Sequence, residues 1–146
     1  MGSKLAEFAA LMQLTRAADY AVRVMIHLAS QEPGKRTSVP EIARAVEVPE
    51  NFLSKVLQTL SRRGLIQSHR GVTGGFELSA GGRTVSMLEV LEALEGPIAL
   101  NVCVGECGAC RRKSRCPAHK VWVEAQEALA GVLRRASIAD LARQAA

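Results

Sequence analysis

Residues 48–80, VPENFLSKVLQTLSRRGLIQSHRGVTGGFELSA, decide the fold because they combine a short helix that has well-marked ends with a β-hairpin directly after it. Pro49 suits the first turn of a helix, and Gly64 suits its end, where two preceding arginines complement the helix dipole. Two short runs of β-prone side chains then flank a glycine-rich turn at 70–75. The stretch therefore predicts a helix followed by a two-stranded hairpin.

Two more helices are expected before this stretch. LTRAADYAVRVMIHLAS, residues 14–30, has Thr15 as its N-cap and apolar side chains at spacings of three and four, which indicates one buried face. SVPEIARAVEV, residues 38–48, begins with Ser38 and Glu41, a capping-box pair. A short helix, a tight connection and a longer basic helix are typical of a helix-turn-helix. With the hairpin after them, they predict a winged helix.

A long amphipathic helix is expected in the last part of the chain. Apolar side chains recur there on one face of a helix of about five turns. The members of this stripe are Trp122, Ala125, Leu129, Val132 and Leu133. Because little chain remains to cover the stripe, we expect it to pack against a second copy, and two-fold symmetry also suits a palindromic duplex. The alternative is that the stripe packs against the first helix of the same chain.

These elements predict a mainly α fold with a small β-hairpin wing. Residues 12–97 are expected to form a winged helix-turn-helix DNA-binding domain. A cysteine-rich loop follows at 98–119, and residues 120–146 hold the dimerisation helix and a C-terminal helix that starts after a break near Ser137. Residues 1–11 resemble a translated vector linker before a second start codon, so they are left out of the predicted fold.

Composition favours double-stranded DNA as the partner. A chain of 146 residues can form one domain with its own core. Its net charge of +5 and pI of about 9.4 favour a polyanionic partner. Only 3% of residues are aromatic, which leaves few stacking platforms for single strands. No stretch approaches the roughly 20 apolar residues of a membrane span, and no secretory signal is visible, so we expect a cytoplasmic protein with reduced thiols.

Donors and acceptors for DNA lie on the outer face of the second helix of the helix-turn-helix. They are Asn51, Ser54, Lys55, Gln58, Thr59 and Arg62. The predicted buried face of the same helix consists of Phe52, Leu53, Val56, Leu57 and Leu60. In the hairpin turn, Arg70 and Thr73 lie beside glycines that allow the backbone to approach a phosphate or enter the minor groove. The alternatives are a solvated helix face and an ordinary flexible turn.

All the cysteines of the chain lie in CVGECGACRRKSRCPAH, residues 103–119. They are Cys103, Cys107, Cys110 and Cys116, and His119 follows them. A structural zinc site usually takes its ligands from two separated segments, whereas an iron-sulfur cluster suits ligands that come from one loop. The spacing therefore favours a cluster. Zinc binding, redox-active thiols and a disulfide remain the alternatives.

From residue 12 to about 142, the chain resembles the IscR, NsrR and RirA family of iron-sulfur winged-helix regulators. The resemblance rests on MQLTRAADYAVRVMIHLA, on VPEIARAVEVPENFLSKVLQTLSRRGLIQSHRG, on the GGF of the hairpin and on SIADLA near the end. It implies a homodimeric transcription regulator that binds a [2Fe-2S] or [4Fe-4S] cluster. It also implies that the presence or damage of the cluster changes DNA binding.

The resemblance also suggests cluster ligands. By position, Cys103, Cys110 and Cys116 correspond to the three cysteine ligands of that family. The fourth would be His119, as in the IscR type, or Asp19 of the other subunit, as in the NsrR type. Six residues instead of five separate the first two of these cysteines, and Cys107 is an additional thiol that could replace Cys103. Asp19 could equally interact favourably with the helix dipole, and His119 could simply cap or pack at the start of its helix.

The sequence therefore predicts a homodimeric DNA-binding repressor or activator whose cluster senses nitric oxide, iron or cluster status. One alternative is a metal-free, thiol-based redox-sensing repressor of the same fold. Another is an iron-sulfur electron carrier or redox enzyme. Because no Rossmann, P-loop or nucleophile motif is present, we expect no enzymatic activity.

Overall fold

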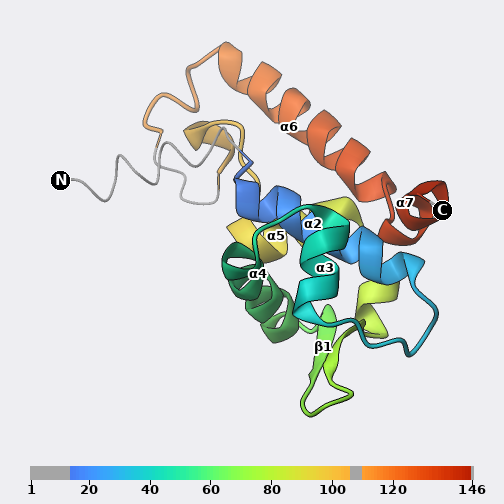
Figure 1. The fold of residues 1–146 in the computed structure, drawn as a ribbon. Coiled ribbons are helices and arrows are strands. Elements are labelled where there is room, and N and C mark those ends of the chain that lie inside the picture. The colour runs from blue at the N-terminus through green and yellow to red at the C-terminus, as the bar shows by residue number, and fades with distance from the viewer. Residues whose placement is uncertain (1–13, 106–109, 146) are drawn as a thin grey trace.

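The computed structural model describes residues 14–105 and 110–145. In chain order its elements are α2 (Arg16–Ser30), α3 (Val39–Val46), α4 (Glu50–Arg62), β1 (Ile66–His69), β2 (Gly75–Leu78), η1 (Gly81–Arg83), α5 (Met87–Glu95), η2 (Val102–Val104), α6 (Ala118–Arg135) and α7 (Ile138–Ala145). The mainly α fold with one hairpin is confirmed (Figure 1). The predictions for residues 1–11 and for Cys107 lie outside the described residues.

The predicted N-caps Thr15 and Ser38 are confirmed, and a further one is present at the start of α5. In each, a short polar side chain satisfies a free amide of the first helical turn. The Thr15 hydroxyl accepts a hydrogen bond from the third residue of α2 at 3.2 Å. Ser38 and Glu41 form the reciprocal capping box of α3, and Ser86 and Glu89 form that of α5. Three helix starts are thus defined by residues that lie within one turn of each other.

The turn of the helix-turn-helix is built by two local features. Glu47, which ends α3, takes a left-handed conformation with a φ of 56°. Pro49 is the N-cap of α4, one residue before the predicted first-turn position, and its carbonyl accepts the amides of Phe52 and Leu53 at 3.1 Å each. At the other end of α4, Gly64 has a φ of 75°, which favours glycine, and its N–H donates to the carbonyl of Ser61.

The core is arranged around α2, which contacts α3, α4, α5, α7 and β2. On α4 the buried side chains are Leu53, Val56, Leu57 and Leu60, as predicted. The prediction that Phe52 belongs to this face is wrong, because its side chain is 57% exposed. Successive residues of a helix point about 100° apart. Phe52 therefore falls outside the arc that the four buried side chains share.

The wing is a two-stranded hairpin, as predicted, and one residue outside it forms an additional β-bridge that the sequence did not predict. In the antiparallel β1–β2 pair, Ile66 lies opposite Leu78 and His69 lies opposite Gly75. Thr37, just before α3, forms a β-bridge with Phe76: its N–H donates to the Phe76 carbonyl at 2.9 Å and its carbonyl accepts the Phe76 N–H at 2.8 Å. This bridge attaches the base of the wing to the start of α3.

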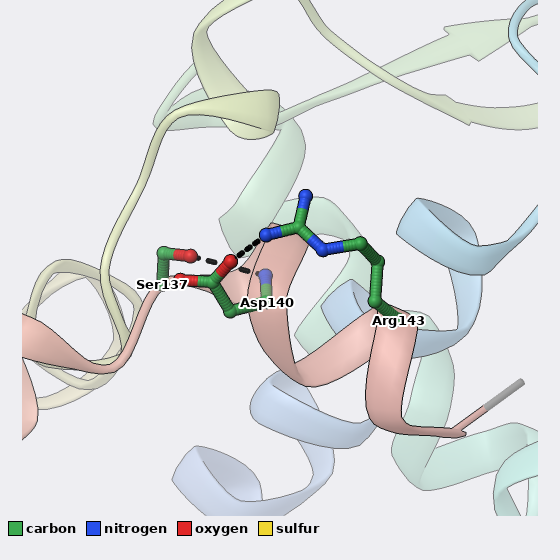
Figure 2. Close-up of polar contacts among 3 residues, drawn as sticks. All are labelled: Ser137, Asp140 and Arg143. Carbon is green, nitrogen blue, oxygen red and sulfur yellow. Dashed lines mark hydrogen bonds and ion pairs between the residues drawn. The ribbon is translucent and has the colours of Figure 1, made fainter.

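The C-terminal helix α7 packs against α2, and Ile138 at its start is fully buried. Figure 2 shows how the helix begins: the Ser137 hydroxyl accepts the Asp140 N–H at 3.0 Å, and Asp140 pairs with Arg143 one turn later. A β-bridge between Ser86 and Ser137 joins this start to the start of α5. The predicted break near Ser137 is confirmed.

Helix α6 differs from the others, because none of its residues is fully buried. It contacts α5 and η2. The predicted single stripe is partly wrong, because Leu133 is partly buried against the core of its own chain and Val132 is 57% exposed. An apolar stripe remains accessible on this helix at the helical spacing of four, three and four, made of Val121, Ala125, Ala128 and Val132.

Candidate nucleic-acid interface and cysteine loop

The polar face of α4 is accessible, as predicted. Asn51, Ser54, Lys55, Gln58 and Arg62 are exposed, and Thr59 is partly exposed. The hydroxyls of Ser54 and Thr59 donate to backbone carbonyls one turn earlier, at 3.0 and 3.1 Å. Their oxygens can still accept hydrogen bonds from base amino groups. Within the described residues, neither Lys55 nor Arg62 has a carboxylate within ion-pair distance.

The tip of the wing presents the second predicted group, Arg70 and Thr73, both exposed. The turn is closed by a hydrogen bond from the Gly74 N–H to the Gly71 carbonyl at 3.0 Å, and Gly71 has a φ of 105°. Further down the strands, His69 Nε2 lies 2.5 Å from Glu77 Oε1. This cross-strand contact and the Thr37 bridge hold the hairpin while its tip stays free.

Two basic residues beside the wing did not enter the sequence prediction. Lys35 and Arg36 are exposed and directly precede Thr37, whose bridge to β2 places them at the base of the hairpin. The Lys35 ammonium donates to Gln31 at 2.9 Å. A basic pair before a capping box is the signal that could have identified them. Such charges supply sequence-independent attraction to phosphates.

The cysteine loop begins at η2 and ends at the start of α6. Cys103 on η2 is buried, and Cys110 and Cys116 are partly exposed; all three are free thiols. Gln126 of α6 holds the chain that leads into this loop, since its side chain accepts the Leu100 N–H at 2.9 Å and donates to the Ile98 carbonyl. Nothing in the sequence pattern distinguished this glutamine from other polar residues of α6.

His119, in the first turn of α6, has a buried Nδ1 atom without a hydrogen-bond partner in the described structure. Leaving a buried polar atom unpaired costs about 1–3 kcal/mol, so such an atom usually has a partner. The thiols and this imidazole are donors that suit an iron-sulfur cluster. However, the described residues contain no group of three or more metal-ligating side chains close enough to hold a metal ion. The donor types fit, but the ligands among the described residues are not assembled.

Asp19, the other candidate for the fourth ligand, lies away from these thiols in sequence and pairs within its own helix. Its carboxylate is 2.8 Å from the Arg23 guanidinium, one turn later. Arg23 also donates to the Val46 carbonyl at 3.3 Å and so connects α2 to the end of α3. The Asp19 side chain is nevertheless about half exposed, and another chain could reach it.

A helix-turn-helix whose second helix presents polar side chains, followed by a hairpin with a basic tip, defines a winged-helix DNA-binding protein. The chain belongs to the Rrf2 family. The family's sequence model, described as an iron-dependent transcriptional regulator, matches residues 14–144. An HTH-type transcriptional regulator of Mycobacterium tuberculosis is 31% identical over 131 residues, which cover 90% of this chain and 81% of that protein.

Solved structures share the fold. CymR, the global cysteine regulator of B. subtilis, has a TM-score of 0.75 and 27% identity, and the match covers 91% of this chain and 98% of CymR. IscR of T. potens has a TM-score of 0.73 and 22% identity, with 94% and 91% of the two chains covered. The protein is therefore a DNA-binding transcription regulator, and its relatives are regulators and not enzymes. Within the described part of the chain, no helix has the length and hydropathy needed to span a membrane.

Proposed function

We propose that this regulator is a homodimer that binds a palindromic operator and that an iron-sulfur cluster in the cysteine loop controls its DNA affinity. The observation that carries the proposal is the position of the loop. Its free thiols lie on η2 and between η2 and the start of α6, the helix that has no fully buried residue. A change of state in the loop would therefore act directly on the helix that we assign to the dimer contact.

The dimer contact in this proposal is the accessible apolar stripe of α6. Val121 and Val132, at its two ends, are 65% and 57% exposed. Two copies of the stripe would bury each other around a two-fold axis, as isologous interfaces require. In Figure 1, α4 and the hairpin lie on the side of the molecule away from α6. A dimer through α6 would thus leave both DNA-binding faces free.

DNA contact is assigned to the exposed side chains of α4 and to the wing. Asn51 and Gln58 are suited to bidentate contact with adenine, and Lys55 and Arg62 to guanine or phosphate. Ser54 and Thr59 would add shorter contacts. Arg70 and Thr73 at the tip would reach the minor groove or its phosphates. Two copies related by a two-fold axis would contact two half-sites.

The residues that would hold the cluster are Cys110, Cys116 and either Cys103 or Cys107, with His119 or the Asp19 of a second subunit as the fourth ligand. A bound cluster supplies chemistry that responds to oxygen, nitric oxide or iron supply through oxidation, nitrosylation or loss of iron. The unpaired Nδ1 of His119 supports that residue over Asp19, which already has a partner in Arg23. Either choice makes the loop a sensor for iron or redox state.

The test is to purify the protein without oxygen and to record its visible spectrum, iron and sulfide content and affinity for a selected operator before and after cluster removal. We expect a coloured protein whose affinity changes on removal. Cys110→Ser and Cys116→Ser should lose iron, while comparison of His119→Ala with Asp19→Asn identifies the fourth ligand by which variant loses it. Equal affinity with and without the cluster would refute the control of DNA binding.

A metal-free thiol switch is the second candidate, because a solved structure of Staphylococcus aureus CymR in an oxidised form is 27% identical to this chain. In this version an oxidant would take two electrons from a pair of loop thiols, and two protons would be released as the disulfide forms. The partly exposed Cys110 and Cys116 are the accessible thiols in the described part of the loop. Colourless, iron-free protein whose DNA affinity changes on treatment with diamide would favour this candidate.

A further inference from the structure

Phe52 is an aromatic side chain in an unexpected place. Of the aromatic residues that the structure describes, Tyr20, Phe76 and Trp122 are partly buried, and only Phe52 is exposed. It is the third residue of α4 and lies beside the exposed Asn51 and one turn before Lys55. Its ring is thus part of the same accessible surface as the polar side chains assigned to DNA.

A single exposed apolar side chain is ordinary on a protein surface. The position of this one is not arbitrary, because the large exposed apolar residues divide into distinct surfaces. Val121, Val123 and Val132 lie on α6, and Leu14 directly precedes the N-cap of α2. Phe52 and Val72 lie on α4 and at the tip of the wing. The second surface is the one that a winged helix presents to DNA. A ring there loses contact with water only when the duplex is bound.

We propose that Phe52 contacts the 5-methyl group of a thymine in each half-site and so makes the operator sequence depend on that methyl. In a helix-turn-helix, the N-terminal residues of the recognition helix approach base edges in the major groove, and Phe52 lies in the first turn of α4. The thymine methyl is the apolar group that the base pairs present there, and apolar side chains recognise it. The assignment rests on the proposed docking of α4 in the major groove.

The packing of α4 supports this assignment. Leu53, the next residue, is fully buried and fixes the rotation of the first turn about the helix axis. Phe52 is consequently held about 100° away from the core side. Burial of one methyl-sized group is worth about a fourfold change in affinity at 25 °C. An operator with two half-sites would respond about 15-fold if both contacts form.

The experiment begins with selection of an operator from random duplexes by the full-length protein. Each conserved thymine is then replaced by deoxyuridine, which removes only the methyl group, and affinity is measured by fluorescence anisotropy. For the wild type we expect one thymine per half-site whose replacement weakens binding about fourfold. Phe52→Ala should bind the thymine operator more weakly and should bind the thymine and uracil operators equally.

Two further variants make the result specific. Phe52→Leu keeps an apolar side chain and should retain part of the methyl dependence. Val72→Ala removes an exposed apolar group from the wing and should retain all of it, because the minor groove carries no methyl groups. Since Phe52 is exposed, Phe52→Ala should unfold at the same temperature as the wild type.

The outcomes separate this inference from the proposed function. If a sequence is enriched but no uracil substitution weakens the wild type, or Phe52→Ala keeps the full methyl dependence, the assignment is overturned and the regulator function stands. If no sequence is enriched at all under cluster-loaded and cluster-free conditions, both the operator-binding proposal and the role of Phe52 are overturned.

Discussion

Gly75→Ala should weaken the attachment of the wing to Thr37. The Cβ of an alanine there would lie 2.7 Å from the Thr37 carbonyl oxygen and 2.8 Å from its carbon, both of which are backbone atoms. Gly75 also has a φ of 145°, which disfavours alanine. To relieve the contact, the two hydrogen bonds between Thr37 and Phe76 must lengthen. Each is worth about 1 kcal/mol, and the backbone conformation adds about 1 kcal/mol, so the expected loss is about 3 kcal/mol.

Gly71→Ala is the matched control. Gly71 has a φ of 105°, but nothing lies within 4 Å of an added Cβ, so only the conformational cost of about 1 kcal/mol applies. Urea unfolding followed by far-UV circular dichroism gives the two free energies, and DNA affinity reports the position of the wing. We expect Gly75→Ala to lose about 2 kcal/mol more than the control. Equal losses would show that the Thr37 bridge does not stabilise the wing.

Three other perturbations test different parts of the structure. Ser38→Ala removes the capping box of α3 and should cost about 1 kcal/mol in urea unfolding, with no loss expected from Ser114→Ala in an exposed turn. Val132→Asp places a charge in the accessible stripe of α6 and should convert the proposed dimer to a monomer in sedimentation without changing the circular dichroism spectrum; an unchanged mass would refute the α6 interface. Burial, assisted by Lys35, lowers the pKa of His27 against a smaller opposing effect of Glu41. The unfolded chain therefore binds a proton on His27 more readily than the folded chain does. The contribution of His27 to the free energy of unfolding should be complete above a pH of about 6.5 and should fall as the pH drops below it. This fall should be smaller in His27→Gln.

Much of the fold could be predicted because its helix ends depend on neighbouring residues. Thr15 and the two capping boxes act within one turn, and Gly64 ends α4 with a left-handed backbone conformation that favours glycine. The order of these signals along the chain was enough to predict a winged helix. The β-bridge between Thr37 and the wing was missed because it involves a single residue, which has no periodic pattern to reveal it.

The errors concern which side of a helix faces the core. Phe52 was assigned to the buried face of α4 because it is large and apolar. The buried face is instead set by the rotation of α4 about its own axis, which places Leu53 and the other buried side chains of this helix toward the core. On α6, the apolar residues form two sides instead of one, and Leu133 packs on its own chain. The hydrophobicity of a residue alone does not show whether its side chain packs into the core of its own chain or contacts a second molecule.

The placement of α6 explains how a local change in the loop could reach the DNA-binding domain. Near the middle of the helix, Gln126 ties α6 to the chain that leads into the cysteine loop. At its C-terminal end, it continues into α7, where Ile138 is buried against the core around α2. Because no residue of α6 is itself fully buried, the helix is held by these two attachments and by its contacts with α5 and η2. A displacement at the loop end would therefore be carried along the helix to α7 and α2, and a second copy bound to the stripe would receive the same displacement.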